Sequence, residues 1–279
     1  MHGEEPIQAR LPRADWLLPD HVPNGVRIFL EDVLTNVVLT LEDSIEGIIL
    51  FGSLVAGGFD PETSDLDLLV AVSADIDDAA LESLRRMHDQ LALAHSEWED
   101  RVDVIYISAV ALKTFKDHDS PLVVISRGEP INRKRTDPGW IMNWHVAREV
   151  GVSLLGPSPH DLIATTTEAD FVSAVRTHMR WMLAKAESSD EPELLAYAIV
   201  TACRALYTCS TGAQASKEAA ALWAERRYPE WSVPIRDARE WRRRAGSRRS
   251  GAKTPILRGL EFVRFAAGEV SRNSEASGL

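Results

Sequence analysis

The sequence has very little cysteine, no long apolar run and no overall positive charge. Its 279 residues include two cysteines, Cys203 and Cys209, too few for a disulfide framework, so free thiols are expected. No apolar run approaches the length of a membrane span. Residues 1–6 have neither the basic nor the apolar region of a signal peptide. We therefore expect a cytoplasmic protein with no membrane partner.

The lack of positive charge bears on the possible partners. The formal net charge is −11 at pH 7, and it is unevenly spread. Residues 226–258 hold eleven Lys or Arg and three Asp or Glu, a net charge of +8, so the rest of the chain carries −19. An acidic body repels duplex nucleic acid and attracts a small polycationic substrate. Plain solubility explains the same charge, and both explanations stay open, but we expect no nucleic-acid partner.

One stretch carries the strongest pattern in the chain. An apolar run at residues 48–51 is followed by Gly52 and Ser53, which predicts a buried strand that ends in a turn. Residues 56–64 are rich in Gly, Pro and short polar side chains, so a loop is expected there. Polar and apolar residues then alternate from residue 65, as in a second strand. This order of elements is more specific than any one of its parts.

Two aspartates begin the second strand. Asp65 and Asp67 are separated by one residue, so they point to the same face of the strand, about 6.6 Å apart. Asp103 stands among β-branched residues in a strand at 101–107, where an unpaired carboxylate is costly. A lone Asp-x-Asp is usually two solvated acids, but paired carboxylates beside a turn can hold Mg²⁺ and the phosphates it carries. We expect such a site here.

The first part of the chain mixes strands and helices. Helices are expected at 24–41, 75–95, 110–117 and 140–150, and the second of them returns the chain to the Asp103 strand. Residues 126–138 are polar and basic, and Gly and Pro interrupt them, so no regular element is expected there. The run 154–159 is dense in turn residues and predicts a linker. We therefore divide the chain into domains 1–158 and 159–279.

The second part has only helical periodicity. Thr167 and Asp170 have the spacing of a capping box, and Ser216 is a further N-cap candidate. Helices are expected from Thr167 to about 187, at 192–212, from Ser216 onward, at 230–246 and at 255–271. The arginine run at 242–244 is interpreted as a solvated helix face.

These features resemble a known family. Gly-Ser, ten to thirteen residues, Asp-x-Asp and a later strand acid resemble the polymerase-β-type nucleotidyltransferases. Residues 204–212 and 216–220 resemble the C-terminal signature of the streptomycin/spectinomycin-type aminoglycoside adenylyltransferases. The resemblance implies an α+β fold in which a polymerase-β-like nucleotidyltransferase domain, a mixed sheet with flanking helices, precedes an all-α helical domain.

The same resemblance implies an enzyme. It would transfer AMP from ATP, with Mg²⁺, to a hydroxyl of an aminoglycoside or aminocyclitol antibiotic, streptomycin or spectinomycin first, and so give resistance. Gly52, Ser53 and Ser64 would contact the phosphates of ATP. Arg204 and Lys217 resemble the triphosphate ligands of the family, although on their own they would be ordinary surface cations.

The acceptor site is implied less completely. Asp103 matches a position that is commonly glutamate in the family, and its role as general base, metal ligand or both stays open. Asp190 matches an acidic drug-contacting position, Glu193 lies one residue from another, and Trp181 is a candidate stacking residue or a core residue. Residues 118–136 hold no aromatic side chain, whereas the relatives carry a drug-stacking tryptophan there.

Two other functions are open to the sequence. A nucleotidyltransferase of this kind could act on a protein or another small metabolite, as toxin–antitoxin relatives do, but those tend to lack the helical signature. A catalytically dead nucleotide-binding module is the other, and three intact acids argue against it. We expect ATP and a cationic small molecule as partners of a monomeric protein.

Overall fold

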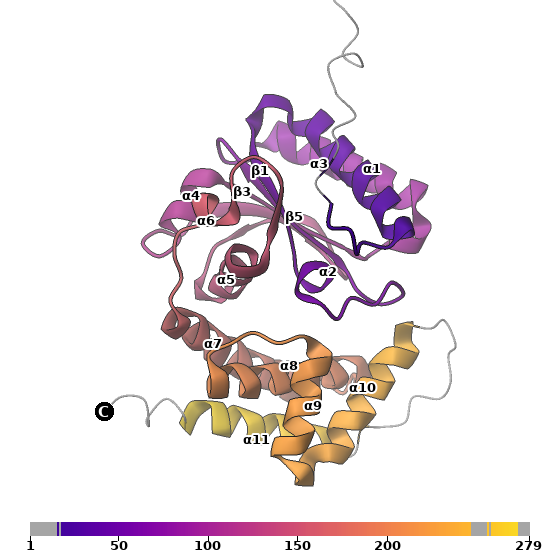
Figure 1. Ribbon diagram of the computed structural model, residues 1–279, viewed down its shortest axis with the longest axis vertical. Helices are drawn as coiled ribbons and strands as arrows, with labels where there is room; N and C mark the ends of the chain where they lie inside the picture. Colours follow the sequence, from indigo (N-terminus) through magenta and orange to yellow (C-terminus); the bar gives the residue numbers. More distant parts are fainter. Residues whose placement is uncertain (1–15, 17, 247–255, 257, 273–279) are drawn as a thin grey trace, which may run out of the picture.

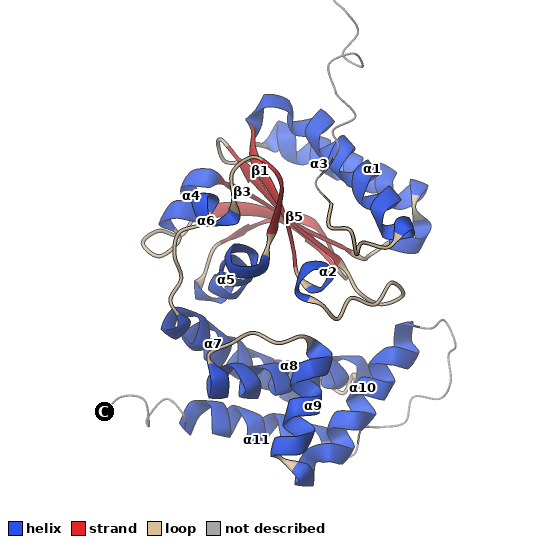
Figure 2. Cartoon of the chain, in the orientation of Figure 1, coloured by secondary structure: helices blue, strands red, loops and turns tan. Residues whose placement is uncertain are grey.

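The computed structural model describes residues 16, 18–246, 256 and 258–272. Within these residues a mixed β-sheet with helices on both faces is followed by a group of packed helices, as Figures 1 and 2 show. The expected α+β fold is confirmed. The two cysteines are free thiols, as expected, with Cys203 buried.

The described residues form one six-stranded sheet in the order β5-β4-β3-β2-β1-β6. Its strands are β1 (Ile45–Phe51), β2 (Leu66–Val72), β3 (Val102–Ser108), β4 (Pro121–Ser126), β5 (Glu129–Arg135) and β6 (Val152–Leu155). β2 and β3 are parallel, and every other neighbouring pair is antiparallel. The parallel pair requires a crossover, which α3 (Asp78–Ala94) supplies.

Alternation along β2 gives the sheet two different faces. Leu66, Leu68 and Val70 belong to the core shared with α1 (Asn24–Leu41) and α3. Leu69 and Ala71 belong to the core on the opposite face. That face is covered by α4 (Ala109–Thr114), α5 (Ile141–Val150) and α6 (Pro159–Leu162). Because side chains alternate, Asp67 points to the same face as Leu69. Short elements complete this half: α2 (Ser53–Ala56), η2 (Glu42–Ser44), η3 (Ser96–Trp98) and η4 (Pro138–Trp140).

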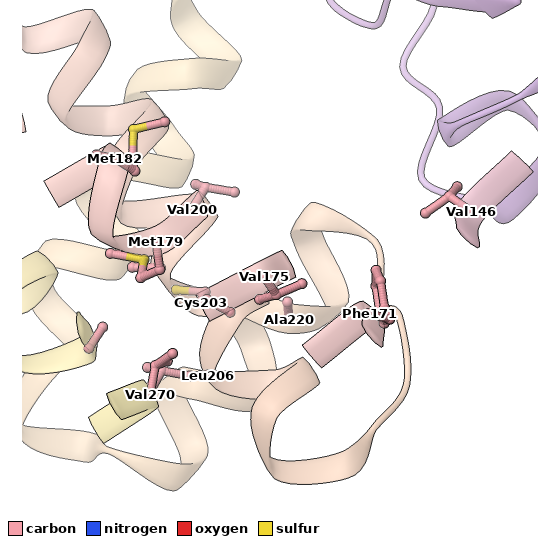
Figure 3. Close-up of a cluster of buried hydrophobic side chains, with 14 of the residues drawn as sticks. Val146, Phe171, Val175, Met179, Met182, Val200, Cys203, Leu206, Ala220 and Val270 are labelled. Atoms are coloured by element: carbon pink, nitrogen blue, oxygen red, sulfur yellow. The ribbon is translucent and has the colours of Figure 1, made fainter. Parts of the chain in front are cut away.

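The helical half is built around α8 (Pro192–Thr211). It contacts all four other helices, which are α7 (Glu168–Glu187), α9 (Lys217–Arg227), α10 (Ser232–Gly246) and α11 (Gly259–Arg272), with η5 (Pro229–Trp231) before α10. Figure 3 shows Val175, Cys203 and Ala220, from three of these helices, lying together. The same hydrophobic cluster includes Val146 of α5, so one core joins the two halves.

The expected ends of these helices are confirmed. Thr167 and Asp170 form the capping box at the start of α7. Gly212 ends α8 in the left-handed conformation, with φ 72°. The Ser216 hydroxyl accepts a hydrogen bond from the backbone N–H of Ala219 and so caps α9.

Two expectations about this architecture are wrong. Residues 126–138 are not irregular, because β5 forms a hairpin with β4 and Gly128 adopts φ 71° in the turn. The expected linker at 154–159 begins inside β6, which pairs with β1. Among the described residues, α8 alone has the length and apolar composition that a membrane span requires. Four helices pack around it, so its composition is that of a core helix. The division after residue 158 stays a prediction.

Candidate active site

The three candidate carboxylates lie together at one end of the central strands β2 and β3. Asp67 in β2 is directly opposite Asp103 in the parallel strand β3, and Phe51 of β1 is its partner on the other side. Neighbouring strands are about 4.8 Å apart, so the two acids stand side by side. Asp65 comes immediately before β2, two residues from Asp67. The pairing predicted from sequence therefore places all three acids together.

Glycine is required where the chain leaves β1. Gly52 has φ 70°, which side chains with a Cβ rarely adopt, and a Cβ at this position would overlap the Asp67 carboxylate. Asp67 accepts a hydrogen bond from the backbone N–H of Ser53. The Gly52-Ser53 turn thus lies directly against the acids. The Ser64 hydroxyl, at the other end of the loop, accepts a hydrogen bond from the Asp60 N–H at 2.9 Å.

The raised pKa values of these acids show that their negative charges are unfavourable without a nearby cation. Burial, and then the charges of Asp103 and Asp65, raise the pKa of Asp67 to about 8. Burial also raises the pKa of Asp103 to about 6, although the Ser126 hydroxyl donates a hydrogen bond to Asp103 Oδ1 at 3.1 Å and opposes that rise. Such a cluster keeps its charges at neutral pH only when positive charge is added to it.

Asp65 supplies an observation that fits a metal ion. Its Oδ1 is buried and has no hydrogen-bond partner, and the nearest cation is Arg127, whose Nη2 lies 3.2 Å away. No group of three or more His, Cys, Asp or Glu side chains in the described part of the chain is arranged as a metal site. Mg²⁺ usually takes only one or two carboxylates together with substrate phosphates and water. Asp65 and Asp67 fit that mode.

Positive charge comes from the helical half. Arg204 lies on α8, and Lys217 is the first residue of α9. Gly58 approaches Ser216 so closely that an added Cβ would lie 2.9 Å from the serine Cβ, and this contact brings the start of α9 to the loop before Asp65. Among the described residues neither cation forms a hydrogen bond or ion pair with an acid, although the charge of Lys217 opposes the rise in the pKa of Asp67.

Burial, and for Lys217 also the neighbouring cations, lowers the pKa values of these two groups. Solvent reaches Lys217 through the cleft, but the surrounding protein, and then the charges of Arg242 and Arg204, lower the pKa of its ammonium to about 8. Burial lowers the pKa of Arg204. Like charges at close range repel each other in a partly desolvated site. An anion bound between them would remove that cost.

Asp65, Asp67 and the two cations line one cleft of about 310 Å³ between the two halves, whereas Asp103 is not among its lining residues. The first half contributes the predicted Gly52, Ser53, Ser64, Asp65 and Asp67, and the second half contributes Arg204, Ser216 and Lys217. Its apolar wall is formed by Phe51, Met142, Val146, Phe171 and Val175. The residues that could bind phosphates therefore lie beside an apolar wall, against which a flat ring could pack.

The residues expected to bind the acceptor lie outside this cleft. Trp181 on α7 is 53% exposed, which excludes the core alternative, and Lys185 Nζ lies 5.0 Å from its ring centroid. Asp190, between α7 and α8, and Glu193, in the first turn of α8, are both exposed. None of the three lines the cleft. Their role stays a prediction.

Three cleft residues were missed in the sequence. Tyr197 lies one turn after Glu193 and two turns before Arg204, so the helical period of α8 could have identified it. His178 on α7 lines the cleft, and burial and the charge of Arg204 lower its pKa, so it is neutral at pH 7. Asn143 of α5 also lines the cleft, and no sequence signal marks it.

Comparison with known proteins agrees with this geometry. Residues 31–135 match the family described as "Nucleotidyltransferase domain", which is the class that the sheet and its acids define. Residues 161–260 match "Aminoglycoside adenylyltransferase, C-terminal domain". The chain therefore combines a nucleotidyltransferase domain with this C-terminal domain.

Curated relatives have the same two-part length. An aminoglycoside (3'') (9) adenylyltransferase of Escherichia coli is 28% identical over 264 residues, which cover 87% of this chain and 94% of the relative. One of Rhizobium radiobacter is 25% identical over 279 residues, 91% of this chain and 97% of the relative. A solved spectinomycin adenyltransferase from Enterococcus faecialis, with ATP and spectinomycin, has a TM-score of 0.71 and 17% identity over 88% of this chain and 99% of its own. That likeness shows the fold.

Proposed function

We propose that this protein transfers AMP from ATP, with Mg²⁺, to a hydroxyl of an aminoglycoside or aminocyclitol antibiotic and so gives resistance. One observation carries the proposal: Asp65 and Asp67 face Arg204 and Lys217 across one cleft. ATP with Mg²⁺ supplies what each side lacks, a cation for the acids and an anion for the cations. The names of the curated relatives support an antibiotic as acceptor, with streptomycin and spectinomycin first.

The chemistry follows from the positions of the groups. Asp103 would accept the proton of the attacking hydroxyl, whose oxygen forms a bond to the α-phosphorus of ATP. The bond between that phosphorus and the oxygen bridging to the β-phosphate breaks, and pyrophosphate leaves. With a pKa of about 6, Asp103 is mostly ionised above pH 7 and can take the proton. The Ser126 hydroxyl donates to one carboxylate oxygen of Asp103, and the other oxygen would take the proton.

The remaining groups position and neutralise the nucleotide. Asp65 and Asp67 would hold Mg²⁺, which when bound offsets the negative charge of the phosphates. Arg204 and Lys217 would bind the triphosphate from the opposite wall. Gly52, Ser53 and Ser64 would contact the phosphates from the sheet edge, and Asp103 could share the metal ion. The predicted domains, residues 1–158 and 159–279, would meet around the nucleotide.

The acceptor would approach over the start of α8. Asp190 and Glu193 are exposed there and would attract a cationic sugar, and the exposed Trp181 offers a ring face to it. The proposal includes a cytoplasmic location, where ATP is available. It also includes a monomer as the working unit, because both walls of the cleft come from one chain. The net charge of −11 supports the absence of a nucleic-acid partner.

A susceptibility panel in a bacterial host tests the proposal. Expression of the protein should raise the inhibitory concentration of streptomycin or spectinomycin, because the modified drug no longer fits its target. Asp67→Asn should remove the protection, and Asp89→Asn, a change at an exposed aspartate of α3, should keep it. If soluble protein is present and the inhibitory concentration rises for no drug of either class, an antibiotic is not the acceptor. A protein or metabolite acceptor then takes its place.

A further inference from the structure

The arginines of α10 have different surroundings. Arg239 is held by Glu218 and Glu225 of α9, with its Nη1 2.6 Å from Glu225 Oε1. Arg243 is largely exposed and lies 4.0 Å from Glu240. Arg242 is half-buried, and no described carboxylate forms an ion pair with it. Its guanidinium carbon lies 5.6 Å from the ring centroid of Tyr197. A desolvated cation without a counter-ion is costly, so this position needs an explanation.

The fold places Arg242 beside the cleft, next to the lining residue Tyr197, although Arg242 is not itself among the lining residues. α10 packs against α8 and α9, which carry Arg204 and Lys217, and Figure 1 shows its C-terminal end rising toward the loop after α2. Tyr197, which the guanidinium covers, lines the cleft. The charge of Arg242 lowers the pKa of Lys217, and the charges of Asp65 and Arg127 in turn act on Arg242. Arg242 is therefore within electrostatic reach of both walls.

We propose that Arg242 is a third cationic ligand of the ATP triphosphate, beside Arg204 and Lys217. Three cations crowded into one site repel each other, and a triphosphate, with about four negative charges, fits that excess. The planar guanidinium can give two parallel hydrogen bonds to one phosphate, and the Tyr197 ring beneath it limits the conformations it must lose on binding. The inference rests on the proposed function because it deepens the ATP site.

Two other roles predict different results. Arg242 could hold only the Tyr197 ring in place, in which case its aliphatic stem would suffice. It could also neutralise Glu193, whose charge acts on it, and then the acceptor rather than ATP would feel its loss. Arg242→Met keeps the stem over Tyr197 and removes the charge, and Arg242→Lys keeps a point charge without the planar fork. Arg243→Gln is the matched control, one residue further along the same helix.

The test is calorimetric titration of each purified full-length variant with ATP and Mg²⁺, without acceptor. Charged hydrogen bonds of this kind correspond to roughly 10- to 100-fold in affinity, so Arg242→Met should bind ATP that much more weakly. Arg242→Lys should recover part of the loss, and Arg243→Gln should match the wild type. Melting temperatures of all variants should agree within about 2 °C, since Arg242 forms no ion pair with a described residue and the 4.0 Å pair between Arg243 and Glu240 is exposed.

Unchanged ATP affinity in Arg242→Met overturns the inference, and so does a loss confined to the KM of the acceptor. If the methionine variant unfolds, the lysine variant decides: affinity equal to wild type together with a melting temperature equal to wild type overturns the role of the planar guanidinium. A wild-type protein that binds no ATP at all contradicts the proposed function itself, which separates the two failures.

Discussion

Replacing Asp67 by asparagine should make the ligand-free protein more stable at neutral pH while it removes AMP transfer. The carboxylate lies at the floor of the cleft beside Asp103 and Asp65, and its pKa is raised from 3.8 to about 8. Between these two values the folded protein binds a proton that the unfolded chain does not. Stability therefore falls as pH rises from about 4 to 8. Asparagine has the same shape and carries no charge, so it escapes this loss.

The magnitude can be worked from the same shift. Each pH unit inside the window costs up to about 1.4 kcal/mol. Water in the cleft reaches Asp67, so we take about half of the full value: roughly 1 kcal/mol lost between pH 6.5 and 8, and about 2 kcal/mol gained by Asp67→Asn at pH 7.5. For a chain of this length that gain is about 5 °C in melting temperature.

Between pH 6.5 and 8, the change in stability reports mainly on the titration of Asp67. His88 is buried with its pKa lowered to about 4, so its contribution rises with pH only up to about 6.5, the value for an unfolded histidine. The pKa of Lys217 is lowered to about 8, so its contribution changes only above that pH. The contribution of Asp103, with a pKa of about 6, changes mainly below the window.

The assay is thermal and urea unfolding in a chelator, at pH 6.5, 7.2 and 8.0, with Asp89→Asn as the control. The wild type should lose stability across the series, and Asp67→Asn should not. Saturating ATP with Mg²⁺ should reverse the order, because it stabilises the wild type and has no complete site in the variant. A wild-type stability that stays flat or rises across this window, or a variant no more stable than the wild type, would refute the reasoning.

Three further substitutions and one control substitution test the site. Lys217→Ala should weaken binding of ATP about tenfold in calorimetry, because it removes one cation from the triphosphate wall, and an unchanged dissociation constant would make it a surface cation. Asp103→Asn should bind ATP with Mg²⁺ almost normally but lose about 10²–10⁴-fold in transfer rate; loss of nucleotide binding would assign it to the metal instead. Gly52→Ala should lower unfolding stability by about 2 kcal/mol or more, since the new Cβ meets Asp67 at φ 70°. Gly57→Ala, at φ 86° in open space, should cost less. Equal losses in these two variants would show that contact with Asp67 adds nothing.

The sequence predicted the centre of this protein better than its edges. Local patterns were enough to predict Asp65 and Asp67 as site residues. Side chains alternate along a strand, and a Gly-Ser turn before a glycine-rich loop has few other interpretations. The strand β5 was missed because an edge strand is open to solvent and carries Arg133, Lys134 and Arg135, which have no apolar alternation. Ile28, in α1, is 64% exposed despite its apolar side chain. Periodicity alone does not say where an apolar face ends.

The helical wall of the cleft depends on contacts between distant parts of the chain. Arg242 belonged to a basic run that reads as a solvated helix face, and only the packing of α10 on α8 and α9 places one of its arginines over Tyr197, which lines the cleft. Arg204 and Lys217 were proposed through resemblance to a family, not through any local pattern. Which residues meet the acceptor is a matter of shape at the mouth of the cleft, and sequence spacing does not give that shape.

The central claim is AMP transfer to an antibiotic hydroxyl, and one measurement tests it most directly. Purified protein is incubated with ATP, Mg²⁺ and either streptomycin or spectinomycin. The mass of the drug is then measured by mass spectrometry, and the released pyrophosphate is assayed. We predict a drug heavier by one adenylyl group, one pyrophosphate released for each drug modified, and neither product with Asp67→Asn. ATP consumed without an adenylylated drug, or no turnover by a protein that binds ATP, would contradict the account.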